Sequence, residues 1–182
     1  MGNQQATIAS SQFKLGWLIG VIEGEGLVGL YRTKSGAKTY YYRPVIKIYN
    51  TELEFIARCH EYLEEMDIPH YIYEGRPRLR VTGKEYKTLY SLYIQGIKRC
   101  QKALAVFKPE MFTGQKGRNL SLISEYIDER LSRPMTQRNQ TREPSVTELK
   151  IVEQVRLNNL RGKGAGSLND YTLSTANNAV KI

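Results

Sequence analysis

The chain has 182 residues, of which 41% are apolar, and its formal net charge is +9. This length and apolar content suit one hydrophobic core with an extension. No apolar run approaches the roughly 18 to 20 residues of a membrane-spanning helix. The first twelve residues lack the order of a signal peptide, so we expect an intracellular protein with no membrane contact. The sequence does not indicate its compartment, which could be a prokaryotic or archaeal cytoplasm or an organelle.

The sequence has only two cysteines and two histidines, too few for a disulfide framework or a His-rich zinc site. Cys59 and Cys100 lie far apart and form no CxxC pair, so we expect two buried, inert thiols rather than a disulfide framework. His60 and His70 are too few for a His-rich zinc site. We interpret His60 as a core or boundary residue and assign no chemistry to His70.

The positive charge is concentrated in one part of the chain. Eleven Lys or Arg and two acidic residues lie from Arg76 to Arg118, which accounts for a local charge of +9. Tyrosines are interleaved with these cations. A local excess of this size indicates a polyanionic partner such as DNA or RNA, although a solvated basic surface is the alternative.

Residues 1–12 are polar and are predicted to be flexible. The first predicted helix runs from about Phe13 to Glu25; it is apolar or glycine from Leu15 to Ile22 and ends in Glu23 and Glu25. The last turn of a helix favours cations, because its free carbonyls carry partial negative charge. Two acids there therefore indicate a bound divalent cation, since hard cations take carboxylate and carbonyl oxygens.

Glycines follow one side of this helix. Gly16, Gly20 and Gly24 are four residues apart and fall near one stripe. Each costs roughly 1 kcal/mol relative to alanine in a helix, so the stripe indicates close packing against another backbone. Gly24 and Gly26 are also suited to ending the helix in a left-handed conformation.

Two strands follow, at residues 27–34 and 39–50, separated by a turn at 35–38. Alternation places Val28, Leu30, Ile46 and Ile48 toward the core. The opposite face then carries the candidate DNA contacts of both strands, which are Gly29, Tyr31, Thr33, Arg43 and Lys47.

The next predicted elements are a helix at 52–66, a hairpin with strands at 70–74 and 77–82, and a helix at 84–93. Leu53, Ile56, Ala57, His60 and Leu63 mark the expected buried stripe of the first of these helices. The hairpin adds four candidate DNA contacts, Tyr73, Arg76, Arg78 and Arg80. The resulting order is αββαββα, an α+β fold with a four-stranded antiparallel sheet, helices on one face and a polar, basic face opposite.

Further helices are predicted through Phe107 and near residues 118–131 and 146–158. Residues 132–145 form a polar, basic connector with two prolines. We therefore expect a core domain at 13–131, followed by a helical extension and tail at 132–182 whose role the sequence does not indicate.

The stretch from Leu18 to Gly26 reads L-I-G-V-I-E-G-E-G. It resembles the nine-residue signature of the LAGLIDADG homing endonucleases, with Glu in place of both aspartates, and the order of elements matches that family to about residue 107. The resemblance implies the family fold and a DNA endonuclease that needs Mg²⁺ or Mn²⁺. Only one copy of the signature is present, which in the family implies a homodimer.

The resemblance also implies site residues. The second acid, Glu25, binds the catalytic metal in such proteins, with help from the carbonyl of Gly24. Asn50 matches by place a polar residue near the nucleophilic water, and Lys98 a basic residue that stabilises phosphate charge. Arg99 and Lys102 compete with Lys98 for that role. The implied dimer interface comprises Gly16, Trp17, Gly20 and Gly24.

Three functions remain open from sequence. The first is an intron-encoded, site-specific endonuclease that cuts both strands of a long, nearly palindromic DNA duplex. The second is a maturase that binds intron RNA and assists splicing. The third is a DNA-binding regulator that has kept this fold without catalysis.

Overall fold

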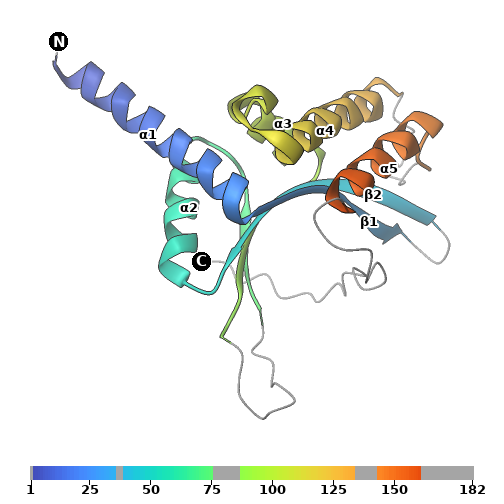
Figure 1. Ribbon diagram of the computed structural model, residues 1–182, viewed down its shortest axis with the longest axis horizontal. Coiled ribbons are helices and arrows are strands. Elements are labelled where there is room, and N and C mark those ends of the chain that lie inside the picture. Colours follow the sequence, from blue (N-terminus) through green and yellow to red (C-terminus); the bar gives the residue numbers. More distant parts are fainter. Residues whose placement is uncertain (1, 36–38, 76–86, 134–142, 161–182) are drawn as a thin grey trace.

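The computed structural model describes residues 2–35, 39–75, 87–133 and 143–160. Its centre is a curved antiparallel sheet of four strands in the order β1-β2-β4-β3 (Figure 1). The elements in chain order are α1 (Gly2–Glu25), β1 (Gly26–Ser35), β2 (Thr39–Asn50), α2 (Leu53–Glu65), β3 (Tyr71–Glu74), β4 (Tyr90–Gln95), α3 (Ile97–Val106), the 3-10 helix η1 (Pro109–Met111), α4 (Gly114–Ser132) and α5 (Val146–Leu160). The predicted αββαββα order is confirmed.

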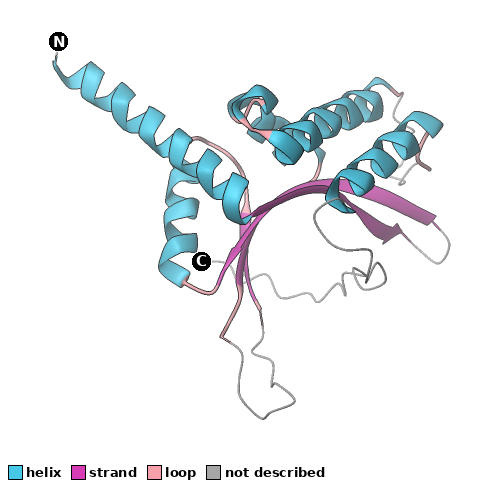
Figure 2. Cartoon of the chain, viewed as in Figure 1, coloured by secondary structure: helices cyan, strands magenta, loops and turns pink. Residues whose placement is uncertain are grey.

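The helices lie on one side of the sheet. Figure 2 shows α1 and α2 at one end and α3, α4 and α5 over the long β1–β2 hairpin. The core between helices and sheet is built from Leu18 and Ile22 of α1, Ile46 and Ile48 of β2, and side chains of the other elements, all buried. Full burial of one such side chain stabilises the fold by roughly 1.5–3 kcal/mol. Among the described residues, the opposite face of the sheet carries no helix except at Gly29, where the end of α5 lies close through Asn159.

Helix α1 begins at Gly2, not near Phe13 as the sequence predicts. Residues 3–12 contain Ala and Gln, which favour helices, and no Gly or Pro to interrupt one. Their polarity suggested a flexible segment, but the backbone continues the helix beyond the core. Within the described ranges, no helix is both long and apolar enough to cross a membrane.

The last strand and the helix after it differ from the prediction. Residues 84–93 are predicted to be a helix, whereas Tyr90–Gln95 form β4 between β2 and β3. Leu92 and Ile94 of this strand face the core, but Leu89, Tyr90 and Tyr93 also fall at helical spacing. A short apolar run of this kind cannot be told from a helix by its periodicity. The predicted strand at 77–82 lies outside the described residues.

The buried side of α2 also differs. Ile56, Cys59 and Leu63 are buried, whereas Leu53, Ala57 and His60, which the sequence places in the buried stripe, are exposed. The buried side of α2 is rotated around the helix axis relative to the prediction, because Phe55 and Tyr62 pack against Trp17 of α1. Their ring centroids lie 5.6 and 5.3 Å from that of Trp17. These large aromatic contacts decide which side of α2 faces α1.

Helix α5 secures the edge of the sheet through buried amides. Asn119 of α4 donates to the Val28 carbonyl at 3.1 Å and to Asn159 Oδ1 at 2.9 Å. Asn158 Nδ2 donates in turn to Asn119 Oδ1 at 3.0 Å. Because β1 is an edge strand, its outward carbonyls need partners. Part of the predicted extension is therefore integral to the core.

A buried carboxylate fixes the start of α5. Glu148 is fully buried and accepts from Arg130 at 2.9 Å and from Arg133 at 3.2 Å. Ser145 Oγ accepts from the Glu148 amide at 3.0 Å, and Glu148 accepts from the Ser145 amide at 3.0 Å. This reciprocal pair is a capping box, and it joins the end of α4 to the start of α5.

We expect Glu148→Ala to lower the free energy of unfolding by roughly 3–5 kcal/mol, because it leaves two largely buried guanidinium groups without their anion. Glu153→Ala is the control. It removes a surface ion pair with Arg156, measured at 3.2 Å, and should cost below about 1 kcal/mol. Urea unfolding measures both. Equal stability of the two variants would contradict the assigned role of Glu148.

Candidate active site and nucleic-acid interface

The two acids at the end of α1 have different surroundings. The half-buried Glu23 carboxylate accepts from the Thr113 amide at 2.5 Å and from Thr113 Oγ1 at 3.3 Å. Thr113 directly precedes α4, where a helix favours negative charge. Glu25 is exposed, and within the described part of the chain its carboxylate makes no hydrogen bond or ion pair. Glu23 therefore has a structural partner, and Glu25 is open to a ligand.

Lys116, which sequence reasoning missed, completes this junction. From the first turn of α4, its Nζ donates to the carbonyl oxygens of Ile22 at 2.6 Å and Glu23 at 2.5 Å. These are among the last carbonyls of α1, which have no partner within their own helix. Burial lowers the pKa of Lys116, and the charges of Glu23 and Glu25 oppose that shift. The Lys116 ammonium group is thus held at the end of α1 by contacts across 94 and 93 residues, which no local pattern signals.

The last glycine of the signature is required for space. A Cβ on Gly26 would lie 2.5 Å from the Ile22 carbonyl oxygen and 2.8 Å from its Cα. The expected left-handed ending is wrong, since the positive-φ glycines in the described ranges are Gly96 and Gly114. Glycine instead lets β1 leave the helix directly, which keeps Glu25 beside the first residue of the sheet.

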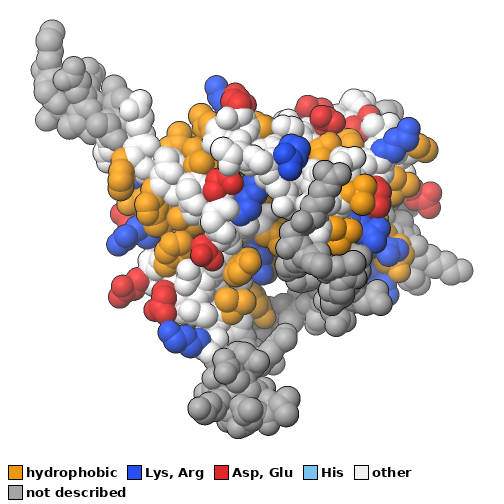
Figure 3. All heavy atoms as spheres, viewed as in Figure 1, with side chains coloured by type: hydrophobic (Ala, Val, Ile, Leu, Met, Phe, Trp, Pro, Cys, Tyr) orange, Lys and Arg blue, Asp and Glu red, His pale blue; other side chains and the backbone are white. Residues whose placement is uncertain are grey.

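The glycine stripe of α1 is open in the single chain. A Cβ on Gly16, Gly20 or Gly24 would meet nothing within 4 Å. Phe13, on the same side of the helix, is 66% exposed. Figure 3 shows hydrophobic side chains gathered along this part of α1. Trp17 differs from the glycines, because it packs on α2 of its own chain.

Asn50 lies at the same end of the sheet as Glu25. It is the last residue of β2, two beyond Ile48, which pairs with Gly26. Its Oδ1 accepts from the Glu52 amide at 3.0 Å, so it turns the chain into α2. Asn50 therefore has a turn-forming contact and a position near the end of α1.

Lys98 lies elsewhere. It follows Gly96, whose amide donates to the Pro44 carbonyl at 2.9 Å. Pro44 is four residues along β2 from Ile48, a separation of about 13 Å. Lys98 lines a cavity of about 560 Å³ with Arg43, Arg99 and Arg130. The structure thus places Lys98 in a basic cavity and not beside Glu25.

The open face of the sheet carries alternating tyrosines and cations. Lys47 Nζ lies 4.9 Å from the ring centre of Tyr93, which stacks on Tyr71 at 5.1 Å. Tyr71 donates to Gln95 at 2.5 Å, and the Arg99 guanidinium lies 5.9 Å from the Tyr71 ring. These contacts hold flat rings and positive charge in fixed positions, an arrangement suited to nucleic acid.

Other predicted contacts occupy the same face by register. Tyr31 pairs with Arg43, Thr33 with Tyr41, and Gly29 with Val45. Arg43 is exposed and also donates to the Tyr41 hydroxyl. Tyr73 pairs with Ser91 at the far edge. Gly29 and Val45 are buried, and Asn159 lies 3.5 Å from where a Cβ of Gly29 would be. Arg76, Arg78 and Arg80 lie outside the described residues.

Comparison with solved structures finds 94 similar chains, whereas no protein-family model and no curated protein matches. I-CeuI, a group I intron-encoded homing endonuclease complexed with DNA, is 15% identical with a TM-score of 0.53, over 86% of this chain and 69% of that one. The LAGLIDADG homing endonuclease I-GzeII, complexed with its DNA target, is 12% identical with a TM-score of 0.49, over 78% of this chain. This chain spans 42% of the length of I-GzeII.

The homing endonuclease I-CvuI is 14% identical with a TM-score of 0.48, over 84% of this chain and 96% of that one. The fold assignment rests on the I-CeuI match together with the order of the elements and the register of the sheet. With the signature Leu18–Gly26 at the junction of α1 and β1, this chain has the LAGLIDADG homing-endonuclease fold.

Proposed function

We propose that the chain is a site-specific DNA endonuclease that works as a homodimer. The observation that carries this proposal is the exposed Glu25 carboxylate two residues beyond the Glu23 carbonyl that Lys116 binds, at the end of a helix with an open glycine stripe. An acid, a cation and a face of tyrosines and basic residues on one sheet suit phosphodiester hydrolysis on a long duplex. That I-CeuI is intron-encoded and binds DNA supports the same class and an origin in intron homing.

Glu25 and the Gly24 carbonyl would hold Mg²⁺ or Mn²⁺, since both ions prefer oxygen ligands. Such an ion, when bound, activates water and stabilises the leaving oxygen of a phosphodiester. Lys116 fixes the end of α1 and adds positive charge against the scissile phosphate. Glu23 orients the two helices. Asn50 remains the candidate for orienting the attacking water, from the adjacent end of β2.

Lys47, Arg43 and the tyrosines around them would contact the duplex through the open face of the sheet, with Tyr31 and Thr33 of β1 alongside. Arginine at guanine is the commonest specific base contact, and lysine at phosphate adds affinity that depends on salt. Arg76, Arg78 and Arg80 stay proposed contacts of the same kind. Lys98 and Arg99, in the basic cavity, are proposed phosphate contacts.

The dimer would form where α1 crosses its symmetry mate along Gly16, Gly20 and Gly24. An isologous contact of this kind brings two copies of Glu25 together, one for each DNA strand. The half-buried Trp17 would lie at the margin of the contact while it packs on α2.

RNA binding is a second candidate, because the stacked Tyr71 and Tyr93 form a platform on which unpaired bases could stack. A maturase should bind its intron RNA more tightly than the joined-exon DNA. The endonuclease proposal requires tighter binding to the joined-exon DNA than to the intron RNA. Filter binding with both nucleic acids distinguishes the two functions.

We expect Glu25→Gln to bind the target duplex with unchanged affinity in buffer without divalent ions, and to lower the cleavage rate in Mg²⁺ at least about a hundredfold, because it removes the charge that would hold the metal. The substrate is a duplex selected from a random library by binding to the unaltered chain. Glu54→Gln, which changes an exposed acid of α2, is the control and should cleave normally. Full cleavage by Glu25→Gln would exclude the catalytic assignment.

The contacts of Lys116 support it as the lysine of the active site, whereas the family resemblance implies Lys98. We expect Lys116→Met to reduce cleavage roughly a hundredfold with little loss of DNA binding, because it removes a cation beside the acids. Lys98→Met should mainly weaken binding and lower its dependence on salt. Single-turnover cleavage and salt titrations of binding separate the effects, and a larger cleavage defect in Lys98→Met would restore the sequence-based assignment.

The dimer is tested with Gly20→Leu. In the single chain this side chain would enter open space, so the free energy of unfolding should stay equal or rise by about 1 kcal/mol. At a helix crossing the same side chain would separate the backbones, and the dimer should dissociate in analytical ultracentrifugation. Ala57→Leu, at an exposed position of α2, is the control. A stable Gly20→Leu dimer would place the interface elsewhere.

A further inference from the structure

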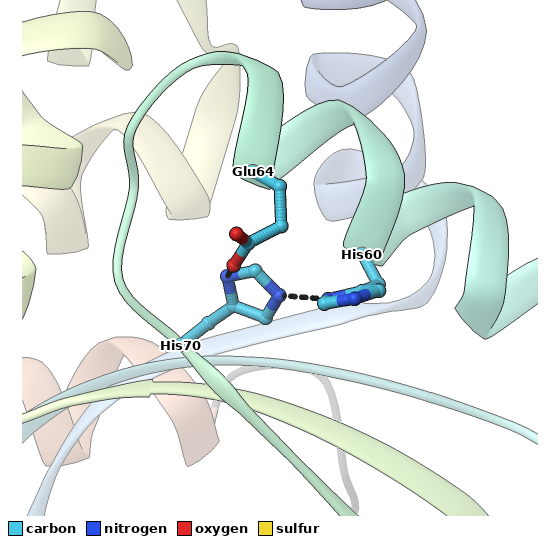
Figure 4. A group of neighbouring side chains, drawn as sticks. All are labelled: His60, Glu64 and His70. Carbon is cyan, nitrogen blue, oxygen red and sulfur yellow. Dashed lines mark hydrogen bonds and ion pairs between the residues drawn. The ribbon is translucent and has the colours of Figure 1, made fainter. Parts of the chain in front are cut away.

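Two histidines and a glutamate meet away from the end of α1. His60 and Glu64 lie one turn apart on α2, and His70 directly precedes β3 (Figure 4). His60 Nδ1 and His70 Nε2 are 2.7 Å apart, and Glu64 Oε1 lies 3.9 Å from His70 Nδ1. One potential ligand atom from each residue lies within 4.8 Å of the other two.

The hydrogen bonds of His70 determine which of its nitrogens is available. Its Nδ1 lies 2.7 Å from the Ile68 carbonyl oxygen, which can only accept, so Nδ1 carries a proton. Nε2 then presents its lone pair toward His60. The His70 side chain is only 1% exposed, so its orientation is fixed by packing.

A histidine oriented by a carbonyl on one nitrogen, with the other directed at a second ligand, is the usual second shell of a metal site. We propose that His60, Glu64 and His70 bind a transition-metal ion of the Zn²⁺ class. The ligands would be His70 Nε2, His60 Nδ1 and a Glu64 carboxylate oxygen. A fourth position is open to water, because His60 and Glu64 are exposed.

Coordination would require movement of the exposed His60 and Glu64 side chains, because Glu64 lies at Nδ1 of His70 and His60 at Nε2. Tetrahedral coordination with Zn–N distances of about 2.0–2.1 Å places two ring nitrogens about 3.3 Å apart. His60 would therefore move by about 0.6 Å relative to the buried His70, and the ion would take the place of the proton that His60 now donates. Glu64, with 64% of its side chain exposed, can rotate to bind.

The imidazole ligands of His60 and His70 determine which ions the site would prefer. Imidazole ligands suit Zn²⁺, Co²⁺ and Ni²⁺, whereas Mg²⁺ prefers oxygen ligands. The bound ion would join the last turns of α2 to the start of β3, the short edge strand of the sheet. His70 is followed by Tyr71, which stacks on Tyr93 on the open face. The ion would thus fix a part of that face without taking part in reactions at Glu25.

The test uses the full chain, freed of metal by chelation and titrated with ZnCl₂ in a calorimeter. We expect binding of one ion per chain, weakened at least about tenfold in His60→Ala and also weakened in Glu64→Gln. Glu61→Gln, a neighbouring exposed acid, should bind as the unaltered chain does. Bound Co²⁺ should show the visible absorption of a tetrahedral site, and His60→Ala should lose it.

His60 is exposed, so its replacement should leave the fold intact, and circular dichroism checks this. Glu25→Gln should keep the zinc site, which makes this result independent of the proposed nuclease activity. Absence of stoichiometric zinc binding, or equal affinity in His60→Ala, would overturn the proposal and leave a hydrogen-bonded histidine pair.

Discussion

The junction between α1 and α4 determines where the candidate active site lies. The two helices satisfy each other's terminal backbone groups. Lys116 of α4 donates to the last carbonyls of α1, and Glu23 of α1 accepts from the amide of Thr113, the residue before α4. Acids at a helix C-terminus are unfavourable by themselves. Lys116 compensates for them, so α1 can end in two carboxylates without a bound ion, and Glu25 stays exposed.

The sheet connects this junction to the rest of the molecule. Gly26 lets β1 leave α1 without an intervening loop, so the position of Glu25 is coupled to the register of β1 and β2. The outer edge of β1 is held by Asn119 and Asn159, and α5 is fixed in turn by the buried Glu148. A helix far along the sequence therefore stabilises the strand that begins at the site.

Local patterns predicted what depends on neighbouring residues. The strands β1 and β2 were legible because their side chains alternate, and the helix before Glu25 because it is a continuous apolar run with glycines four residues apart. β4 was misplaced because Leu89, Tyr90 and Tyr93 also fit a helical stripe. The stripe of α2 was misplaced because Phe55 and Tyr62 pack on Trp17. Lys116 could not be found this way, since its contacts join residues brought together only by the fold.

The two candidate metal sites differ in ligand chemistry, and this difference keeps their ions apart. Glu25 and the Gly24 carbonyl offer only oxygen, which suits Mg²⁺ or Mn²⁺, whereas His60 and His70 offer nitrogen, which favours Zn²⁺. An ion at Glu25 would add a second positive charge near the end of α1, where Lys116 already binds the Glu23 carbonyl. A DNA phosphate at the site would add negative charge and favour the ion, so metal binding at Glu25 should be coupled to DNA binding.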